Sequence, residues 1–192
     1  MKKFPVILDL ETKFTFRQFN DPQKLEVSVA GIFDYRNQTS KSFKEEDLPS
    51  LFKLLETSSY IIGFNINSFD LPVLQRYYAG KLDSFPTFDL LDDIKNKLGK
   101  RLSLNDLISA TLGKKKSGHG LQAIQLYKEG KFEELERYCL DDVLLTKELF
   151  EYGINRGEVL YLDEKGKNAI KVQWKKYLED QGNKESYLTL PF

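Results

Sequence analysis

The pattern of apolar and polar positions along the chain predicts an α/β domain that begins with strands. Apolar segments at residues 4–10 and 26–35 are rich in valine, isoleucine and aromatic residues, and they indicate two strands that pair. Asn37 and Gln38 favour a turn into a third strand at 42–43. We therefore expect an antiparallel meander at the front of the domain.

Helices and strands alternate in the segments that follow. An apolar stripe predicts a helix over residues 45–56, and a short apolar strand follows at 60–65, so this unit favours parallel pairing. Ser68 is expected to cap a helix that runs to Tyr78. The remaining expected elements are a strand at 86–89, helices at 89–98, 103–112, 121–128 and 132–152, and a hairpin of 158–162 with 167–172 that turns at 164–166.

The composition is that of one globular domain. The chain has 192 residues, of which 41% are hydrophobic, which suffices for one core and is too little for two domains. We expect a domain over residues 1–174 and a C-terminal tail over 175–192. Lysine plus arginine and aspartate plus glutamate both total 29, so nucleic-acid binding would depend on local basic patches and not on an overall positive charge.

The sequence favours a cytoplasmic protein without a membrane partner. The first apolar segment is broken by Asp9 long before it reaches the length of a signal or membrane-spanning segment. Cys139 is the only cysteine, which excludes an internal disulfide and a structural zinc site built on a CxxC pair. Both observations fit a reducing compartment.

The first candidate chemistry lies where the first predicted strand ends. Because side chains alternate along a strand, Asp9 and Glu11 point to the same side and can hold one cation together. A strand end that reaches solvent is the alternative. The apolar residues before Asp9 argue against that alternative, since a carboxylate beside a core requires a cation or hydrogen bonds.

A further carboxylate, Asp70, follows the loop after the strand predicted at 60–65. Loops after strand ends are where α/β sheets place functional groups. By itself, Asp70 is explained equally well as an acid that compensates the helix dipole in a first turn. Its significance depends on its combination with the other acids.

The longest predicted helix distinguishes between two adjacent aspartates. At about 100° per residue, the apolar residues of this helix form one face, and Asp142 lies within that face. Asp141 lies on the polar side and is interpreted as a solvated residue. Tyr138 precedes Asp142 by four residues, so the two side chains project from one face toward a common ligand.

Three separated segments thus supply four carboxylates, which would repel one another if they converged without cations. Two divalent metals would balance the four negative charges. Such a pair, about 4 Å apart, stabilises both the attacking and the leaving oxygen in phosphoryl transfer. Because ligation by oxygen alone suits magnesium or manganese, the residues predict a two-metal site of that kind.

The three segments resemble the motifs of the DEDD superfamily of exonucleases. The motifs are Asp9-Leu-Glu-Thr12, Gly63-Phe-Asn-Ile-Asn-Ser-Phe-Asp70 and Tyr138-Cys-Leu-Asp-Asp142. The Tyr-x-x-x-Asp spacing is similar to that of the tyrosine subclass (DEDDy), whereas the histidine subclass would place histidine where Arg137 stands. The connecting segments resemble predicted exonuclease-like domains, including the YprB-type ribonuclease H-like group.

The resemblance implies an RNase H-like fold, with a mixed sheet flanked by helices, and 3′-to-5′ exonuclease activity on a single-stranded 3′ end of DNA or RNA. The implied metal ligands are Asp9, Glu11, Asp70 and Asp142. Tyr138 would orient the attacking water. The backbone of Leu10 and the side chain of Asn65 would contact the terminal nucleotide. Phe69 is a candidate for stacking on a base, although an aromatic residue just before a helix more often packs in the core.

Two further features concern partners. Lys115, in the run of lysines at 114–116, is expected to grip phosphates, because a neutral protein with an acidic centre needs a basic rim; a solvated surface is the alternative. The apolar tail at 187–192 is similar to peptides by which bacterial replication and repair proteins bind the sliding clamp, although Tyr187 stands where that motif prefers glutamine. A tail packed on its own domain is the alternative there.

Two other functions remain open at this point. A structure-selective endonuclease would use the same kind of metal centre, and the sequence does not separate it from an exonuclease. A non-catalytic nucleic-acid-binding module is the alternative outside the enzymes, but the presence of all four acids and Tyr138 argues against it. The leading expectation is a 3′-to-5′ exonuclease with a role such as DNA repair, either as a stand-alone nuclease domain or together with partners.

Overall fold

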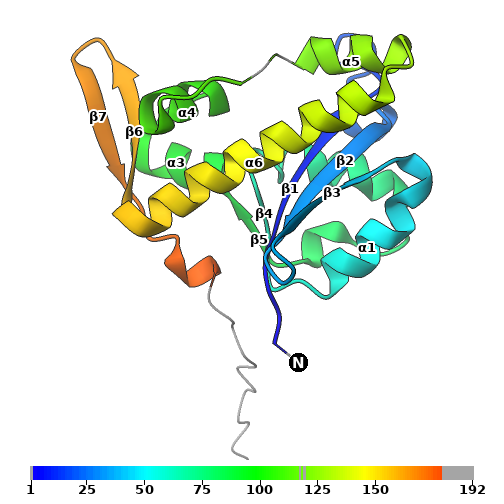
Figure 1. The fold of residues 1–192 in the computed structure, drawn as a ribbon, viewed down its shortest axis with the longest axis horizontal. Coiled ribbons are helices and arrows are strands. Elements are labelled where there is room, and N and C mark those ends of the chain that lie inside the picture. The colour runs from blue at the N-terminus through cyan, green and yellow to red at the C-terminus, as the bar shows by residue number, and fades with distance from the viewer. Residues whose placement is uncertain (1, 117, 119, 179–192) are drawn as a thin grey trace, which may run out of the picture.

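The computed structural model describes residues 2–116, 118 and 120–178. At its centre is a five-stranded sheet in the order β3-β2-β1-β4-β5 (Figure 1). The strands are β1 (Val6–Thr12), β2 (Val27–Asp34), β3 (Thr39–Phe43), β4 (Ile61–Gly63) and β5 (Thr87–Asp89), and a separate hairpin pairs β6 (Glu158–Asp163) with β7 (Gly166–Lys171). β1 pairs antiparallel with β2 and parallel with β4. The predicted meander, parallel pairing and terminal hairpin are therefore confirmed.

Helices cover both faces of the central sheet. They are α1 (Leu48–Glu56), α2 (Asp70–Leu74), α3 (Leu90–Leu98), α4 (Leu104–Leu112), α5 (Gly120–Lys128) and α6 (Phe132–Arg156). α1 and α2 contribute apolar side chains to the core on one face, and α3, α4 and α6 contribute to the core on the other. The longest helix, α6, runs across the sheet and contacts β1, β2 and β3 (Figure 1).

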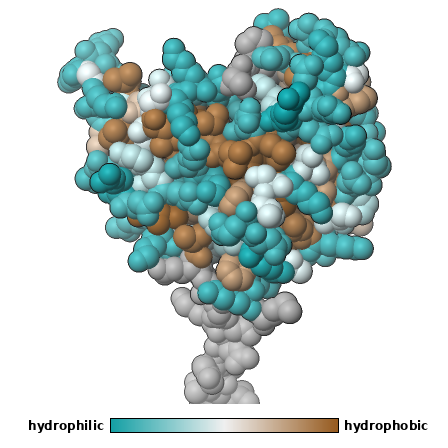
Figure 2. All heavy atoms as spheres, viewed as in Figure 1, coloured by the Kyte–Doolittle hydropathy of each residue, from teal (hydrophilic) through white to brown (hydrophobic). Residues whose placement is uncertain are grey.

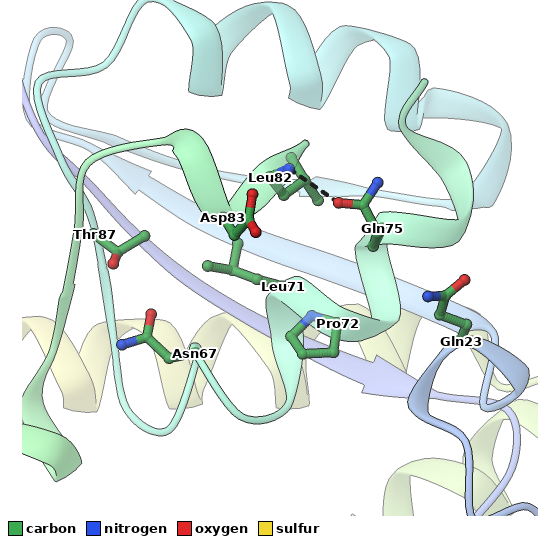
Figure 3. A pocket seen from close by; sticks show the side chains of 8 residues that line it. All are labelled: Gln23, Asn67, Leu71, Pro72, Gln75, Leu82, Asp83 and Thr87. Atoms are coloured by element: carbon green, nitrogen blue, oxygen red, sulfur yellow. Dashed lines mark hydrogen bonds between the residues drawn. The ribbon is translucent and has the colours of Figure 1, made fainter. Parts of the chain in front are cut away.

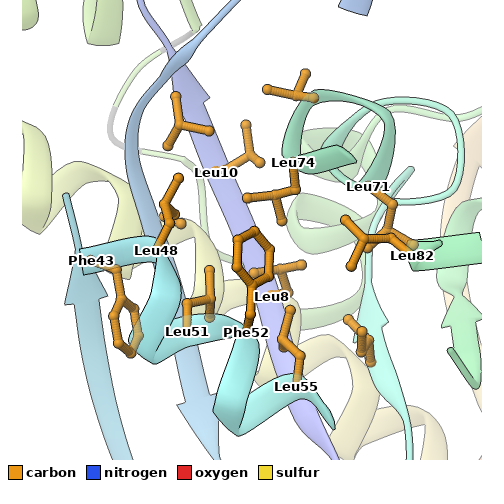
Figure 4. Close-up of a cluster of buried hydrophobic side chains, with 14 of the residues drawn as sticks. Leu8, Leu10, Phe43, Leu48, Leu51, Phe52, Leu55, Leu71, Leu74 and Leu82 are labelled. Atoms are coloured by element: carbon orange, nitrogen blue, oxygen red, sulfur yellow. The ribbon is translucent and has the colours of Figure 1, made fainter. Parts of the chain in front are cut away.

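The alternation of side chains along β1 divides its residues between these two cores. Leu8 and Leu10 are buried in the cluster that includes α1 and α2, shown from close by in Figure 4. Ile7 points to the opposite face and packs with residues of α6. Because the period of a strand is two residues, the side chains of Asp9 and Glu11 share the face of Ile7. The fold therefore directs both acids toward α6.

Two helix starts differ from the prediction. Residues 45–47 form a 3₁₀ turn, and α1 begins only at Leu48, with Pro49 in its first turn. The predicted cap at Ser68 is wrong, because Ser68 is exposed and Phe69 occupies the N-cap position without a side-chain capping bond. Hydrogen bonds to the end of β5 hold the loop before α2 instead. The other predicted elements are present, with small differences at their ends.

The segment after the hairpin is attached to the domain. Trp174 packs on Gly153 of α6, and its indole N–H donates to Asp93 at 2.8 Å. Tyr177 stacks on Phe88, with ring centroids 3.8 Å apart. The first residues of the proposed tail thus contact the domain, while its remainder, including the proposed clamp-binding residues 187–192, lies outside the described residues.

Figure 2 shows the face of the molecule over which α6 runs. Hydrophilic residues cover most of this face, and hydrophobic residues gather across its middle. Within the described part of the chain, no helix combines the length and the apolar character needed to cross a membrane.

Candidate active site

Three of the four predicted acids form one cluster between β1 and α6. One carboxylate oxygen from each of Asp9, Glu11 and Asp142 lies within 4.8 Å of the other two. Asp9 and Glu11 are half-buried at the end of β1, as the alternation of the strand predicts. The cluster joins two segments more than a hundred residues apart in sequence.

Asp142 reaches the cluster because α6 packs closely on the sheet. Asp142 is 1% exposed, whereas Asp141 is exposed, as the helical phase predicts. Gly31 of β2 lies opposite Asp9, and a Cβ atom at Gly31 would stand 3.0 Å from the Sγ atom of Cys139 on α6. The glycine therefore lets the helix bring Asp142 to Asp9. Sequence reasoning missed Gly31, since the strand pattern does not mark it.

Asp70, the first residue of α2, lies beside the cluster of three. It is 2% exposed, and its Oδ1 accepts the backbone N–H of Leu10 at 3.0 Å. β4 pairs with β1 only at Val6 and Ile7 and ends at Gly63. Farther along the same edge of β1, Asp70 takes the hydrogen bond from Leu10 that a longer β4 would otherwise accept. The Leu10 side chain is in the core and its N–H is taken, so a backbone contact from Leu10 to a nucleotide would use its carbonyl oxygen.

The loop that carries Asn65 is held by Asp89, which sequence reasoning treated only as a helix boundary. The Asp89 carboxylate accepts the backbone N–H groups of Asn65 at 2.8 Å and Asn67 at 3.0 Å. As the N-cap of α3 it also accepts the N–H of Leu91 at 2.9 Å. Asn65 has a φ of 69°, a left-handed conformation that asparagine adopts more readily than most residues. Asp89 therefore fixes the loop that leads into Asp70.

Lys116 completes the site; sequence analysis included it in the lysine run at 114–116 but did not predict its contact with the acids. Its Nζ lies 2.6 Å from Oδ2 of Asp142, and its side chain is 22% exposed. Burial lowers the pKa of Lys116, but the negative charges of Asp142, Asp9 and Glu11 outweigh burial and raise it, so the lysine stays charged. The expected phosphate-gripping residue Lys115 is exposed instead. A run of three lysines without periodicity gives no signal for choosing among them.

The residues present fit a divalent cation. Carboxylate oxygens are the donors that magnesium and manganese prefer. The Oδ1 atom of Asp142 is buried and has no hydrogen-bond partner among the described residues. A buried carboxylate oxygen without a partner is costly, and a cation would satisfy it. Asp9, Glu11 and Asp142 would hold the cation, and Asp70 stands next to them.

Tyr138 lies one helical turn before Asp142 and is 4% exposed. Burial, together with the charges of Glu11 and Asp142, raises the pKa of its hydroxyl, so this group stays protonated and can donate a hydrogen bond. Tyr138 borders an adjoining hollow of about 280 Å³ that also contacts Asp141, and Gly118 lies against its ring. Its contact with an attacking water therefore stays a prediction.

Two hollows meet at the acids and form one groove. The first has a volume of about 420 Å³, and the aromatic residues along it are Phe14, Phe16, Phe64 and Phe69. The second has a volume of about 500 Å³, and its polar and basic lining residues are Asn65, Arg101, Ser103 and Lys116. Asp9, Phe64 and Lys116 line both hollows. The groove thus has an aromatic half, which also contains Glu11, Asp70 and Asp142, and a basic half, and Asp9 belongs to both.

A third hollow, of about 440 Å³, lies between α2 and the segment before β5 (Figure 3). Its lining is neutral except for Asp83, and it includes none of the clustered acids. The backbone N–H of Leu82 donates to Gln75 across its edge at 3.0 Å. This hollow is as large as the groove halves but offers no cluster of catalytic groups, so we assign it no role in the chemistry.

The raised pKa values of the clustered acids predict that the metal-free protein loses stability as the pH rises. Burial and the charge of Asp142 raise the pKa of Glu11 from 4.5 to about 8, and burial raises that of Asp70 from 3.8 to about 7. Between these ordinary and raised values the folded protein binds more protons than the unfolded chain, so the free energy of unfolding falls with increasing pH. We expect the melting temperature in EDTA to fall from about pH 5 to about pH 8.5, and magnesium to restore it mainly at the upper end. A melting temperature that stays level across this range, with and without magnesium, would contradict the raised pKa values.

Comparisons with known proteins agree with this architecture. A family model described as the RNase H superfamily matches residues 6–154, which include all four acids. Among solved structures, the chain is similar to the family B DNA polymerase from the hyperthermophilic archaeon Pyrobaculum calidifontis, with a TM-score of 0.62 and 18% identity. That similarity covers 80% of this chain and 25% of the polymerase chain, so it bears on the fold alone. A search of curated proteins found no significant match. The fold class predicted from the sequence is confirmed.

Proposed function

Because the chain belongs to the RNase H superfamily, we propose that it is a metal-dependent 3′-to-5′ exonuclease that hydrolyses the phosphodiester bonds of DNA or RNA. The observation that carries the proposal is the cluster of three carboxylates within 4.8 Å of one another, in which Asp142 has a buried oxygen without a partner among the described residues. The cluster stands in a groove with a basic half and an aromatic half. A basic surface binds the phosphates of a nucleic acid, and an aromatic surface stacks on its bases.

Each of the clustered acids has a role in this proposal. Asp9, Glu11, Asp70 and Asp142 would hold two divalent cations, magnesium or manganese. When bound, these cations would stabilise the attacking and leaving oxygens of the phosphodiester. The protonated hydroxyl of Tyr138 would orient the attacking water as a hydrogen-bond donor, a role that suits a phenol whose pKa is raised.

The substrate contacts follow the two halves of the groove. Asn65 and the Leu10 carbonyl would contact the terminal nucleotide, and Phe69 would stack on a base in the aromatic half. Lys116 would contact a phosphate next to the acids, and the exposed Lys115 would contact phosphates farther along the strand. The proposed substrate is a single-stranded 3′ end.

Three finer assignments are part of the proposal. The spacing of Tyr138 and Asp142 supports the tyrosine subclass of the DEDD exonucleases, close to the YprB-type group. Cys139 is a buried free thiol, which suits action in the reducing cytoplasm. The residues at 187–192 would serve as the docking peptide for a sliding clamp, which would place the enzyme in DNA repair.

The proposal is tested with 5′-labelled single-stranded and duplex DNA and RNA, incubated with magnesium, with manganese or with EDTA. We expect labelled products that shorten one nucleotide at a time from the 3′ end, and no cleavage in EDTA. Asp9→Ala protein, purified in the same way, controls for contaminating nucleases. Products cut at internal positions would replace the exonuclease by the endonuclease alternative. Binding without cleavage of any substrate would favour a non-catalytic module.

A further inference from the structure

The segment between β1 and β2 forms an ordered loop beside the acids. Backbone hydrogen bonds close its base, from the N–H of Lys13 to Glu26 at 2.9 Å and from the N–H of Phe14 to Leu25 at 3.1 Å. A turn follows, in which the N–H of Gln18 donates to the carbonyl of Thr15 at 2.9 Å. These bonds hold the residue inside the turn, Phe16, in a defined position.

Three phenylalanines of this loop have different environments. Phe14 packs against the core cluster of Leu8 and Leu10, and Phe19 packs edge-on against Phe14 with ring centroids 5.2 Å apart. Phe16 is 47% exposed, and its nearest ring is that of Phe69, with centroids 5.8 Å apart. Burial in the core therefore explains Phe14 and leaves Phe16 with an unused aromatic surface.

The unused surface of Phe16 faces the groove. Phe16 and Phe69 line the same hollow of about 420 Å³ as the three clustered acids. The exposed Leu121 of α5 lines this hollow too, so its outer part is apolar. Arg101 lines the basic half of the groove, which shares Asp9, Phe64 and Lys116 with the aromatic half. A ligand with both a flat apolar group and an anionic group would complement the two halves.

We propose that Phe16, together with Phe69, is a stacking site for the unpaired base at the end of a nucleic-acid strand. This inference rests on the proposed function, which places the scissile phosphate at the acids. Every base offers an aromatic face to a ring, so the site selects unpaired ends and not a particular sequence. A base that stacks on Phe16 has left the base stack of a duplex, and separating it from its partner costs free energy. The enzyme therefore prefers single strands and frayed ends to fully paired ends.

The test compares Phe16→Ala with Phe19→Ala on labelled single strands in magnesium. Phe19 belongs to the same loop and is 38% exposed, but it does not line the groove, so it is a matched control. We expect Phe16→Ala to raise KM by about 5- to 150-fold with little change in kcat, which corresponds to the usual contribution of one base stacked on an aromatic ring. Phe16→Trp retains a stacking surface and should keep KM near the wild-type value.

Substrates whose last two nucleotides lack bases distinguish stacking from a structural role. On these abasic ends, wild type and Phe16→Ala should have the same KM. On normal ends, the wild type should prefer single strands to paired ends, and this preference should be smaller in Phe16→Ala. An equal loss on normal and abasic ends would overturn the stacking site, because the loss would not depend on a base. An unchanged KM on normal ends would overturn it as well.

A binding measurement separates failure of this inference from failure of the proposed function. Fluorescence anisotropy reports the affinity of the protein for base-bearing and abasic oligonucleotides without requiring cleavage. If no substrate is cleaved but Phe16→Ala binds base-bearing ends more weakly, the proposed function fails and the stacking site stands. If the protein cleaves its substrate and Phe16→Ala changes neither KM nor affinity, the stacking site fails and the proposed function stands.

Discussion

Asp142→Asn is expected to cleave at least about 10³-fold more slowly than the wild type, whereas Asp141→Asn should keep nearly the full rate. A metal centre lowers the activation free energy by several kcal/mol, and each tenfold of rate corresponds to about 1.4 kcal/mol. The two aspartates are adjacent in α6, so they share helix, sequence context and chemistry. They differ in position: Asp142 is 1% exposed in the cluster with Asp9 and Glu11, and Asp141 is exposed.

The pair of variants is compared by initial rates on a labelled single strand at saturating magnesium. Melting temperatures without metal show whether each variant folds. We expect Asp142→Asn to remain folded, because the substitution keeps the shape of the side chain and Lys116, which loses its ion-pair partner, is still attracted by Asp9 and Glu11. Equal rates for the two variants would show that the cluster is not the catalytic centre.

The acids that sequence analysis located are those whose position depends on local periodicity. Asp9 and Glu11 follow from the two-residue period of a strand, and Asp142 follows from the 3.6-residue period of a helix. These periods decide which face a side chain shares with its neighbours, and the observed burial agrees with them. Asp70 has no periodic neighbours, so the sequence indicated it only through the family resemblance and the charge balance. In the structure its hydrogen bond to Leu10 and the hollow that it lines with the other acids place it beside the cluster.

The features that sequence analysis missed depend on contacts between distant segments. Asp89 follows the usual pattern of a helix cap, and its bonds to the loop of Asn65, 24 residues away, exist only in the folded chain. These bonds also explain why the expected cap at Ser68 failed, since the loop is held from outside and not by its own side chain. Gly31 is an ordinary strand glycine until α6 packs on it. Local rules do not contain such information.

Lys116→Met is expected to lower the free energy of unfolding of the metal-free protein by about 3 kcal/mol at pH 8, because removing one partner of a buried ion pair leaves the other charge uncompensated. Lys116 lies 2.6 Å from Asp142 and is also attracted by Asp9 and Glu11. The pKa of Lys116 in the folded protein is raised above its ordinary value of 10.5. Its stabilising charge is therefore fully present at pH 8 and is lost only as the pH rises above 10.5 and through the raised pKa.

The loss should depend on the charge of the acids that Lys116 faces. The pKa of Glu11 is about 8 and that of Asp70 about 7, so at about pH 5.5 both groups carry protons and the loss in Lys116→Met should shrink. Saturating magnesium should shrink the loss of stability at pH 8, because the cation supplies the same positive charge.

Urea denaturation at both pH values, with EDTA or magnesium, measures these differences. Lys115→Met is the control, since that neighbouring side chain is exposed. If Lys116→Met loses the same amount of stability under all conditions, Lys116 stabilises the fold by packing and not by its charge. If the loss disappears at about pH 5.5 and also in magnesium, Lys116 is the counter-ion that a metal replaces.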